Sequence, residues 1–235
     1  MRTFTADRYA HWRSAAFTSS WLLYAGYYLC RENMSTVLQL PSAHAEQDSL
    51  TKLLFTFALA YVFGNIFSGT VADLRGPRHI ALIGGILSAS ATTAMLLPHN
   101  LLALQLLNGF GQGLGFPALS RLLAVWFTRK ERPSVLAWWS ASYSLGGGLA
   151  AGITLWCATT HFFLSSWGWK RCFVLPPLLL ALLSLLLLDY AGRTAKRRAG
   201  ADPVDEQEAT GVLSGWRVVL SNSHIRTISG MYFFL

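Results

Sequence analysis

Residues 53–72 read LLFTFALAYVFGNIFSGTVA, a run of 20 residues without a charged side chain between Lys52 and Asp73. An α-helix rises roughly 1.5 Å per residue, so a run of this length covers about 30 Å, the thickness of the hydrocarbon core of a bilayer. A helix satisfies all its backbone hydrogen bonds internally, which a chain within lipid requires. This stretch therefore predicts a membrane-spanning helix.

The composition of the whole chain points the same way. Of its 235 residues, 53% are hydrophobic and 13% are charged, about half the charged share of an ordinary soluble domain. The net charge of +8 falls in short clusters between long apolar runs. Because membrane proteins distribute basic residues in this way, we exclude nucleic acid as a partner and predict a multi-pass membrane protein in contact with the lipid bilayer.

Six stretches in the sequence have the length and apolar character of a membrane span. They cover approximately residues 14–29 with continuation toward 40, 53–72, 80–97, 101–127, 134–164 and 172–188. We predict an all-α membrane protein with a six-transmembrane-helix bundle at 14–188, preceded by a tail at 1–13 and followed by a polar linker at 189–221. Residues 222–235 resemble the start of a seventh helix, with Asn222 or Ser223 as its N-cap. It is expected to be cut off within the membrane.

The positions of lysine and arginine predict the orientation. One set of alternate loops and tails contains Arg2, Arg8, Arg13, Arg75, Arg78, Arg129, Lys130, Arg132, Arg193, Lys196, Arg197 and Arg198. The opposite side has Lys52, Lys170 and Arg171, with Arg31 at its edge. By the positive-inside rule, the amino terminus and the linker are expected to be cytoplasmic, most simply in a bacterial inner membrane.

Metal and cofactor chemistry is not expected from this sequence. Cys30, Cys157 and Cys172 lie in or beside apolar segments at unrelated spacings, and no two histidines have the spacing of metal ligands. No serine, histidine and carboxylate set indicates hydrolysis. We therefore expect no metal, no cofactor and no enzymatic activity.

The loop after the second predicted span reads GTVADLRGPRH, residues 69–79. It resembles the signature loop of the major facilitator superfamily, whose members include twelve-helix secondary transporters, and the matching positions are Gly69, Asp73, Gly76 and Arg78. Leu74 and Pro77 replace basic residues of that signature. The alternative is an ordinary short basic loop. The resemblance implies that this chain is one half of a twelve-helix fold, and that a carboxy-terminal six-helix half is its missing partner.

Four further stretches resemble the organophosphate:phosphate antiporters of that superfamily, which include transporters of glycerol 3-phosphate, hexose 6-phosphate and glucose 6-phosphate. They are YAGYYLCRENMS at 24–35, LNGFGQGLGFPALSRLLAVWF at 107–127, WWSASYSLGGG at 138–148 and WGWKRCFVLP at 167–176. The resemblance thus extends over nearly the whole chain.

The resemblance implies a substrate site around Arg31. In that family the matching arginine faces the central cavity and binds the substrate phosphate, together with an arginine of the other half. Tyr24, Tyr28 and Tyr61 match tyrosines near that cavity. From the residues alone, Arg31 could equally reach the outer interface or pair with Glu32, and the tyrosines could be packing residues.

Three positions depart from the family pattern. Asn65 stands where the family has lysine, Tyr143 where several members have histidine, and Glu32 where lysine is common. Each departure makes the predicted cavity less positive. Asn65 and Tyr143 remain candidate substrate-binding residues, but a phosphate should be bound more weakly, or another anion preferred.

Glycines and one arginine within the spans suggest packing and gating. The glycines at 109, 111, 113 and 115, and those at 146, 147, 148 and 152, are expected to let helices pack closely. The segment GFGQGLG at 109–115 lacks the spacing of a dinucleotide-binding loop. Arg121 could pair with Asp73 as a gate or extend to the interface.

The leading hypothesis is therefore a secondary active transporter that exchanges an organic phosphate for inorganic phosphate by alternating access. One alternative is a transporter-like membrane sensor of sugar phosphate. The other is an inactive, truncated half-transporter.

Overall fold

The computed structural model describes residues 6–40, 47–97, 100–160, 165–185, 221–224 and 227. Every regular element within these ranges is a helix, as the sequence predicts. The elements are α1 (Ala6–Leu29), α2 (Glu32–Leu38), α3 (Gln47–Arg75), α4 (Pro77–Ala94), α5 (Leu101–Gly113), α6 (Gly115–Trp126), α7 (Arg132–Thr159), the 3-10 helix η2 (Ser165–Phe173), and a helix over 175–185.

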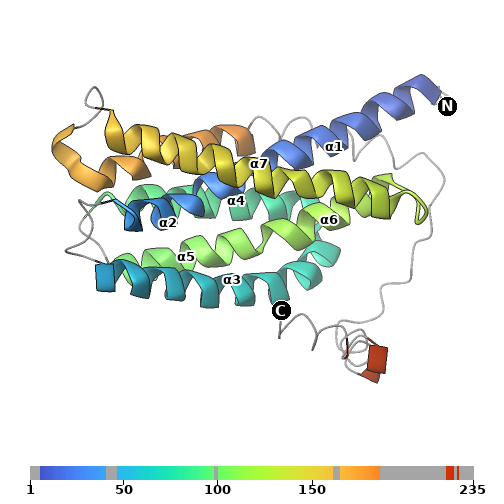
Figure 1. Cartoon of the computed structure of the whole chain (residues 1–235). Coiled ribbons are helices and arrows are strands. Elements are labelled where there is room, and N and C mark those ends of the chain that lie inside the picture. The colour runs from blue at the N-terminus through green and yellow to red at the C-terminus, as the bar shows by residue number, and fades with distance from the viewer. Residues whose placement is uncertain are drawn as a thin grey trace. The chain divides into compact units, whose positions relative to one another are not determined.

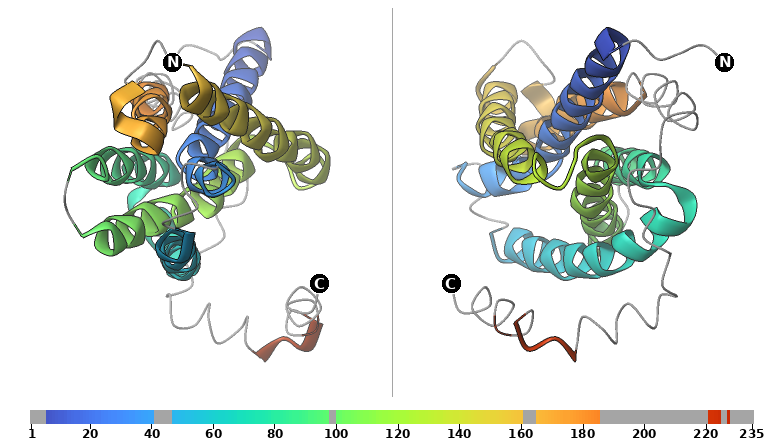
Figure 2. Two further views of the ribbon diagram at one scale, coloured as in Figure 1. Left: turned by 60° about the vertical axis from the view of Figure 1, so that its left-hand side comes forward. Right: turned by 90° about the vertical axis from the view of Figure 1, so that its right-hand side faces the viewer.

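The helices run roughly along one direction and pack side by side (Figure 1). α3 packs along α5, α5 along α4, and α1 along α7, while α6 contacts both α1 and α4. In Figures 1 and 2, α3 and α7 lie on opposite sides of the bundle. The bundle therefore places α1, α4 and α5 where side chains from all three can meet.

Two of the predicted spans are broken into shorter helices. The span predicted from residue 14 is divided at Cys30 and Arg31, between α1 and α2. The span predicted at 101–127 is divided at Leu114, between α5 and α6. The amides of Cys30 and Arg31 donate to the carbonyls three residues earlier, at 3.2 and 3.1 Å, instead of four. Such tight turns leave other carbonyls free for side-chain donors, which matters for the site described below.

Turn chemistry sets several helix boundaries. Gly76 has φ of 86°, a left-handed conformation that favours glycine, and it ends α3 so that Pro77 can open α4. Asn100 caps α5, since its side-chain oxygen accepts from the amides of Leu102 and Ala103 at 3.1 and 3.3 Å.

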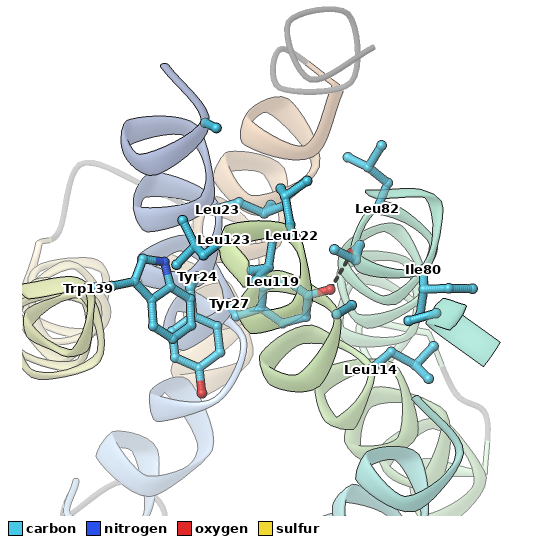
Figure 3. Close-up of a cluster of buried hydrophobic side chains, with 14 of the residues drawn as sticks. Leu23, Tyr24, Tyr27, Ile80, Leu82, Leu114, Leu119, Leu122, Leu123 and Trp139 are labelled. Atoms are coloured by element: carbon cyan, nitrogen blue, oxygen red, sulfur yellow. Dashed lines mark hydrogen bonds between the residues drawn. The ribbon is translucent and has the colours of Figure 1, made fainter. Parts of the chain in front are cut away.

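The larger hydrophobic core lies between α1, α4, α6 and α7 (Figure 3). Tyr27 is fully buried at its centre and donates a hydrogen bond from its hydroxyl to the carbonyl of Ala81. Trp139 of α7 closes the other side, stacked on Tyr24. A second cluster gathers around Met34, Val37, Leu50, Cys157, Cys172 and Phe173. The three cysteines are buried and form no disulfide bond, as expected for packing residues.

Small residues permit the closest helix contacts. A Cβ at Gly113 would lie 2.8 Å from the amide nitrogen of Asn65, so α3 and α5 approach backbone to backbone. Gly109, Gly111 and Gly115 are likewise buried in helix contacts, which confirms their predicted packing role. The prediction is wrong for Gly148 and Gly152. They lie on the exposed side of α7, and an added Cβ would meet no described atom within 4 Å.

By length and composition, two stretches of the described helices could cross a membrane. They are Asp48–Gly69, with a mean hydropathy of 1.6, and Ser166–Leu185, with 1.3. The sequence predicts six spans. The break at Leu114 divides the fourth predicted span into α5 and α6, of 13 and 12 residues, whereas α1 and α7 have 24 and 28 residues. The six-span topology stays a prediction.

Other predicted boundaries differ or lie outside the described residues. α1 begins at Ala6, so the helix includes much of the predicted tail. The linker at 189–221 and the seventh helix at 222–235 fall almost wholly outside the described residues. Within the latter, the side-chain oxygen of Asn222 accepts from the amide of His224 at 3.0 Å, as an N-cap does.

Candidate functional site

The candidate site is built at the break between α1 and α2. Arg31 follows the end of α1 and precedes the first residue of α2. Its guanidinium carbon lies 4.6 Å from the ring centroid of Tyr28 and 4.6 Å from that of Tyr61 on α3. Aromatic faces attract a cation, so these two rings hold the side chain inside the bundle.

Arg31 also makes two hydrogen bonds. Its terminal nitrogens donate to the hydroxyl of Tyr28 at 3.2 Å and to Oε1 of Gln112 at 3.3 Å, while Nε is buried without an acceptor. The ion pair found in the described part of the chain joins Arg13 to Glu131. The alternative in which Arg31 pairs with Glu32 is therefore not what the structure shows. Among the residues that the structure describes, Arg31 is a partly buried cation without a carboxylate partner.

Tyr24 lies one turn before Tyr28 and is almost completely buried. Its ring stacks on Trp139, with centroids 4.7 Å apart and an interplanar angle of 26°, and meets Tyr28 edge-on at 5.8 Å. Tyr24 thus packs between Trp139 and the Tyr28 ring, within the hydrophobic core. The structure brings together Arg31, Tyr24, Tyr28 and Tyr61 of the predicted substrate set.

The other two predicted substrate-binding residues, Asn65 and Tyr143, make no described contact with Arg31. Asn65 donates from its side chain to the carbonyl of Tyr61 at 3.0 Å, one turn earlier on α3. Tyr143 is 44% exposed on α7. The described contacts of Arg31 include neither residue, so their roles at the site stay predictions.

Sequence reasoning missed a polar network beneath Arg31. Gln112 donates from Nε2 to the Tyr27 carbonyl at 2.8 Å and to the Ser88 hydroxyl at 2.9 Å. Ser88 donates to Asn108 at 2.7 Å, and Asn108 donates to the carbonyl of Cys30 at 3.2 Å. All these amide and hydroxyl side chains are buried.

The network has a signal in the sequence. Gln105, Asn108 and Gln112 are spaced by three and four residues, which places them on one face of α5. Asn108 and Gln112 donate to the carbonyls of Cys30 and Tyr27 at the α1–α2 break, and Asn108 also donates to Oε1 of Gln105 at 3.2 Å. Uncharged polar residues at helical spacing inside an apolar span could have revealed the network.

The predicted gating set is only partly described. Gly76 makes its turn, whereas Gly69 lies exposed with no described atom within 4 Å of an added Cβ. Arg78 is partly buried between α1, α4 and α6, and Arg121 is exposed on α6. The Asp73 side chain lies outside the described residues. Pairing of Asp73 with Arg121 therefore stays a prediction.

A cavity of about 830 Å³ lies between residues 10–21 of α1 and residues 134–145 of α7. Aromatic residues Phe17, Trp21 and Trp138 form much of its wall, together with polar Ser14 and Ser134. Arg31 does not line it. Its inner end reaches Trp21, about one helical turn from Tyr24, so the cavity ends near the aromatic side of the candidate site.

Arg13, which lines that cavity, is paired. One of its terminal nitrogens lies 2.6 Å from Oε1 of Glu131, and its guanidinium carbon lies 4.5 Å from the ring centroid of Phe127. Hydrogen bonds from Arg13, and from the amide and hydroxyl of Thr128, lower the pKa of Glu131 to about 2. The carboxylate therefore stays ionised and links the segment before α7 to α1.

Three relatives show what the chain is similar to. The glycerol-3-phosphate transporter of Bacillus subtilis (strain 168) is 29% identical over 215 residues, covering 84% of this chain and 45% of the transporter. A probable hexose phosphate transport protein of Chlamydia pneumoniae is 26% identical, covering 85% of this chain and 43% of that protein. The membrane sensor protein UhpC of Escherichia coli (strain K12) is 29% identical over 69% of this chain and 37% of its own.

The chain spans less than half the length of each of these relatives. A profile of the Major Facilitator Superfamily matches residues 19–235, which include Tyr24, Tyr28, Arg31, Tyr61 and Gln112. The chain therefore belongs to the Major Facilitator Superfamily.

Proposed function

We propose that this chain is the amino-terminal half of a secondary transporter that exchanges an organic phosphate for inorganic phosphate. Membership of the superfamily makes it part of a family of integral membrane transport proteins and not of enzymes. The observation that carries the narrower proposal is Arg31, a cation held inside the bundle by Tyr28, Tyr61 and Gln112, with no carboxylate partner in the described part of the chain.

A guanidinium suits a phosphate ligand. It has five N–H donors in a planar fork, stays charged at any working pH and matches the oxygens of a phosphate. Hydrogen bonds within the protein use donors on the two terminal nitrogens of Arg31, and Nε has no acceptor. Donors therefore remain for an anion. A charged side chain inside a bundle that spans a membrane is costly. Such a residue is therefore a functional-site hypothesis by default.

The surrounding residues prepare Arg31 for this role. The Tyr28 and Tyr61 rings hold the cation from two helices, and Gln112 fixes one terminal nitrogen from a third. A side chain already held in place loses less conformational entropy when a ligand binds. Tyr24, Asn65 and Tyr143 are proposed as further lining residues, with Gly69, Asp73, Gly76, Arg78 and Arg121 as the gating loop and its partner.

Transport would follow the alternating-access scheme of this superfamily. Two six-helix halves rock around a site near the middle of the membrane, so that it opens to each side in turn. The amino terminus and the linker after the sixth span are proposed to be cytoplasmic, in a bacterial inner membrane. The cavity between α1 and α7 would be part of the route from the amino-terminal side.

The test is exchange by the protein as isolated from its own membrane, reconstituted into phosphate-loaded vesicles. Saturable phosphate exchange is expected, with loss of about 100-fold or more in Arg31→Ala, since a charged hydrogen-bonding partner of a desolvated anion is removed. Arg129→Ala changes an exposed loop arginine and should exchange normally. Exchange by Arg31→Ala equal to that of the unaltered protein would refute the proposed role.

A second function is supported by the similarity to the sensor UhpC, whose identity to this chain equals that of the glycerol-3-phosphate transporter. A sensor would bind a sugar phosphate through Arg31 without moving it. Binding in detergent that is lost in Arg31→Ala, together with no exchange in vesicles, would favour sensing over transport.

A further inference from the structure

Glu32 is the first residue of α2 and follows Arg31 directly. Its side chain is partly buried and has no hydrogen bond or ion pair within the described residues. It also does not pair with Arg31, whose guanidinium is held instead by Tyr28, Tyr61 and Gln112. The α1–α2 break thus presents a cation and an anion on consecutive residues, and neither has an ionic partner within the described ranges.

Two opposite charges this close would ordinarily neutralise each other. A partly buried charge is stabilised by a counter-charge, and an unpaired one is costly. The contacts that hold Arg31 prevent this pairing. Glu32 nevertheless lies at the same break, since it follows Arg31 directly, opens α2 and is partly buried there.

The charges of the site disfavour a simple dianion. Arg31 attracts a phosphate, but Glu32 repels it, and like charges placed together across a binding site oppose association strongly. Asn65 is neutral and its amide is engaged with the carbonyl of Tyr61. Within this half, the substrate set together with Glu32 therefore carries one positive and one negative charge.

We infer that the ligand of this site is a zwitterionic phosphate ester, which carries an ammonium group close to its phosphate. The inference rests on the proposed function, because Arg31 would take the phosphate. Glu32 would accept charge-assisted hydrogen bonds from the ammonium. Each unpaired charge of the break would then gain a counter-charge from a single small molecule, and purely anionic esters would bind more weakly.

The experiment measures binding to the purified protein in detergent by titration calorimetry. The probes are phosphoethanolamine, glycerol 3-phosphate and inorganic phosphate, because the first two resemble each other in size but only the first carries an ammonium. The variants are Glu32→Gln and Glu32→Lys. The matched control is Asp48→Asn, an exposed carboxylate at the start of α3.

The unaltered protein should bind phosphoethanolamine more tightly than glycerol 3-phosphate. Glu32→Gln should reduce that preference about tenfold, which is the value of one charged hydrogen bond. Glu32→Lys should reverse the preference, and Asp48→Asn should retain it. Glutamine has nearly the same volume as glutamate. A folded Glu32→Gln variant should therefore bind inorganic phosphate at least as tightly as the unaltered protein, which provides the check on folding.

Two outcomes separate this inference from the proposed function. A preference for glycerol 3-phosphate that is insensitive to Glu32→Gln, with binding still lost in Arg31→Ala, would overturn the zwitterion inference alone. Binding of none of the probes, or binding unchanged in Arg31→Ala, would overturn the proposed phosphate site as well.

Discussion

A terminal nitrogen of Arg31 donates to Oε1 of Gln112 at 3.3 Å, and Nε2 of Gln112 donates to the carbonyl of Tyr27 at 2.8 Å. One amide therefore does two things. Its oxygen fixes the guanidinium, and its nitrogen supplies a donor to the backbone just before the α1–α2 break. The break and the orientation of Arg31 depend on the same residue of α5.

Replacing Gln112 by leucine should therefore destabilise the fold. The change keeps a similar volume but leaves the Ser88 hydroxyl, the Tyr27 carbonyl and one Arg31 nitrogen with fewer partners. We expect the free energy of unfolding to fall by roughly 2–4 kcal/mol, since each buried polar group that loses its partner costs about 1–3 kcal/mol. Denaturation in detergent measures it. Gln39→Leu, at an exposed glutamine, should cost far less, and equal losses would contradict this account.

Glycines of α7 should respond oppositely to alanine. A Cβ at Gly146 would lie 2.7 Å from Cα of Ala25 on α1, whereas one at Gly148 would meet no described atom within 4 Å. Gly146→Ala should lose about 1–3 kcal/mol of unfolding free energy through overpacking. Gly148→Ala should be neutral or gain up to about 1 kcal/mol, because alanine favours a helix over glycine. Thermal unfolding of both variants decides the matter; a Gly146→Ala variant as stable as Gly148→Ala would show that the helices separate easily.

These glycines show what the sequence can predict. Uncharged runs such as residues 53–72 identify helices because hydropathy depends on composition and length alone. Close packing is different. Gly146 and Gly148 are equivalent in sequence, but 100° per residue around α7 turns one toward Ala25 and the other away, and only the packed structure shows which.

The candidate site also has one part that the sequence can predict and one part that only the packed structure shows. Arg31 stands out in the sequence because a charge at the end of an apolar run requires an explanation. The Gln112 network does not, because an uncharged amide gains importance only when a neighbouring helix presents a carbonyl that it can reach. Asn108 and Gln112 of α5 reach the carbonyls of Cys30 and Tyr27 at the place where α1 breaks. Local sequence cannot reveal such contacts between helices.

Arg171 should be important for the end of α7. It is largely buried, and it donates to the carbonyl of Thr160 at 3.0 Å and also to that of Ala158. These carbonyls have no partner within the helix, so the guanidinium caps α7. Arg171→Met should lower the free energy of unfolding by about 2 kcal/mol or more, the range for charged hydrogen bonds.

The neighbouring residue provides the control for that prediction. Lys170 is exposed, so Lys170→Met removes the same charge without removing a cap and should change stability little. Hydrogen exchange gives a local readout, since amides near Thr159 should exchange faster only in Arg171→Met. Faster exchange in both variants would assign the effect to charge and not to capping.

The Arg13–Glu131 pair makes a prediction about pH. Its hydrogen bonds lower the pKa of the Glu131 carboxyl from the ordinary 4.5 to about 2. A group whose pKa is lower in the folded state stabilises the fold above its unfolded pKa, and this contribution is lost as pH falls through the folded pKa. The stabilisation should therefore be complete above about pH 4.5 and should disappear progressively toward pH 2.

Glu131→Gln should flatten that part of the stability profile, because glutamine has no proton to gain. The thermal midpoint in detergent, compared at pH 6 and pH 3, should fall less in this variant than in the unaltered protein. Arg129→Gln, in the same exposed loop, should keep the full fall. Raised salt should reduce the difference between the unaltered protein and Glu131→Gln at pH 6, because a half-exposed ion pair is screened. An identical acid profile in both proteins would mean that other carboxyl groups control acid stability and that this pair does not secure α1 to the segment before α7.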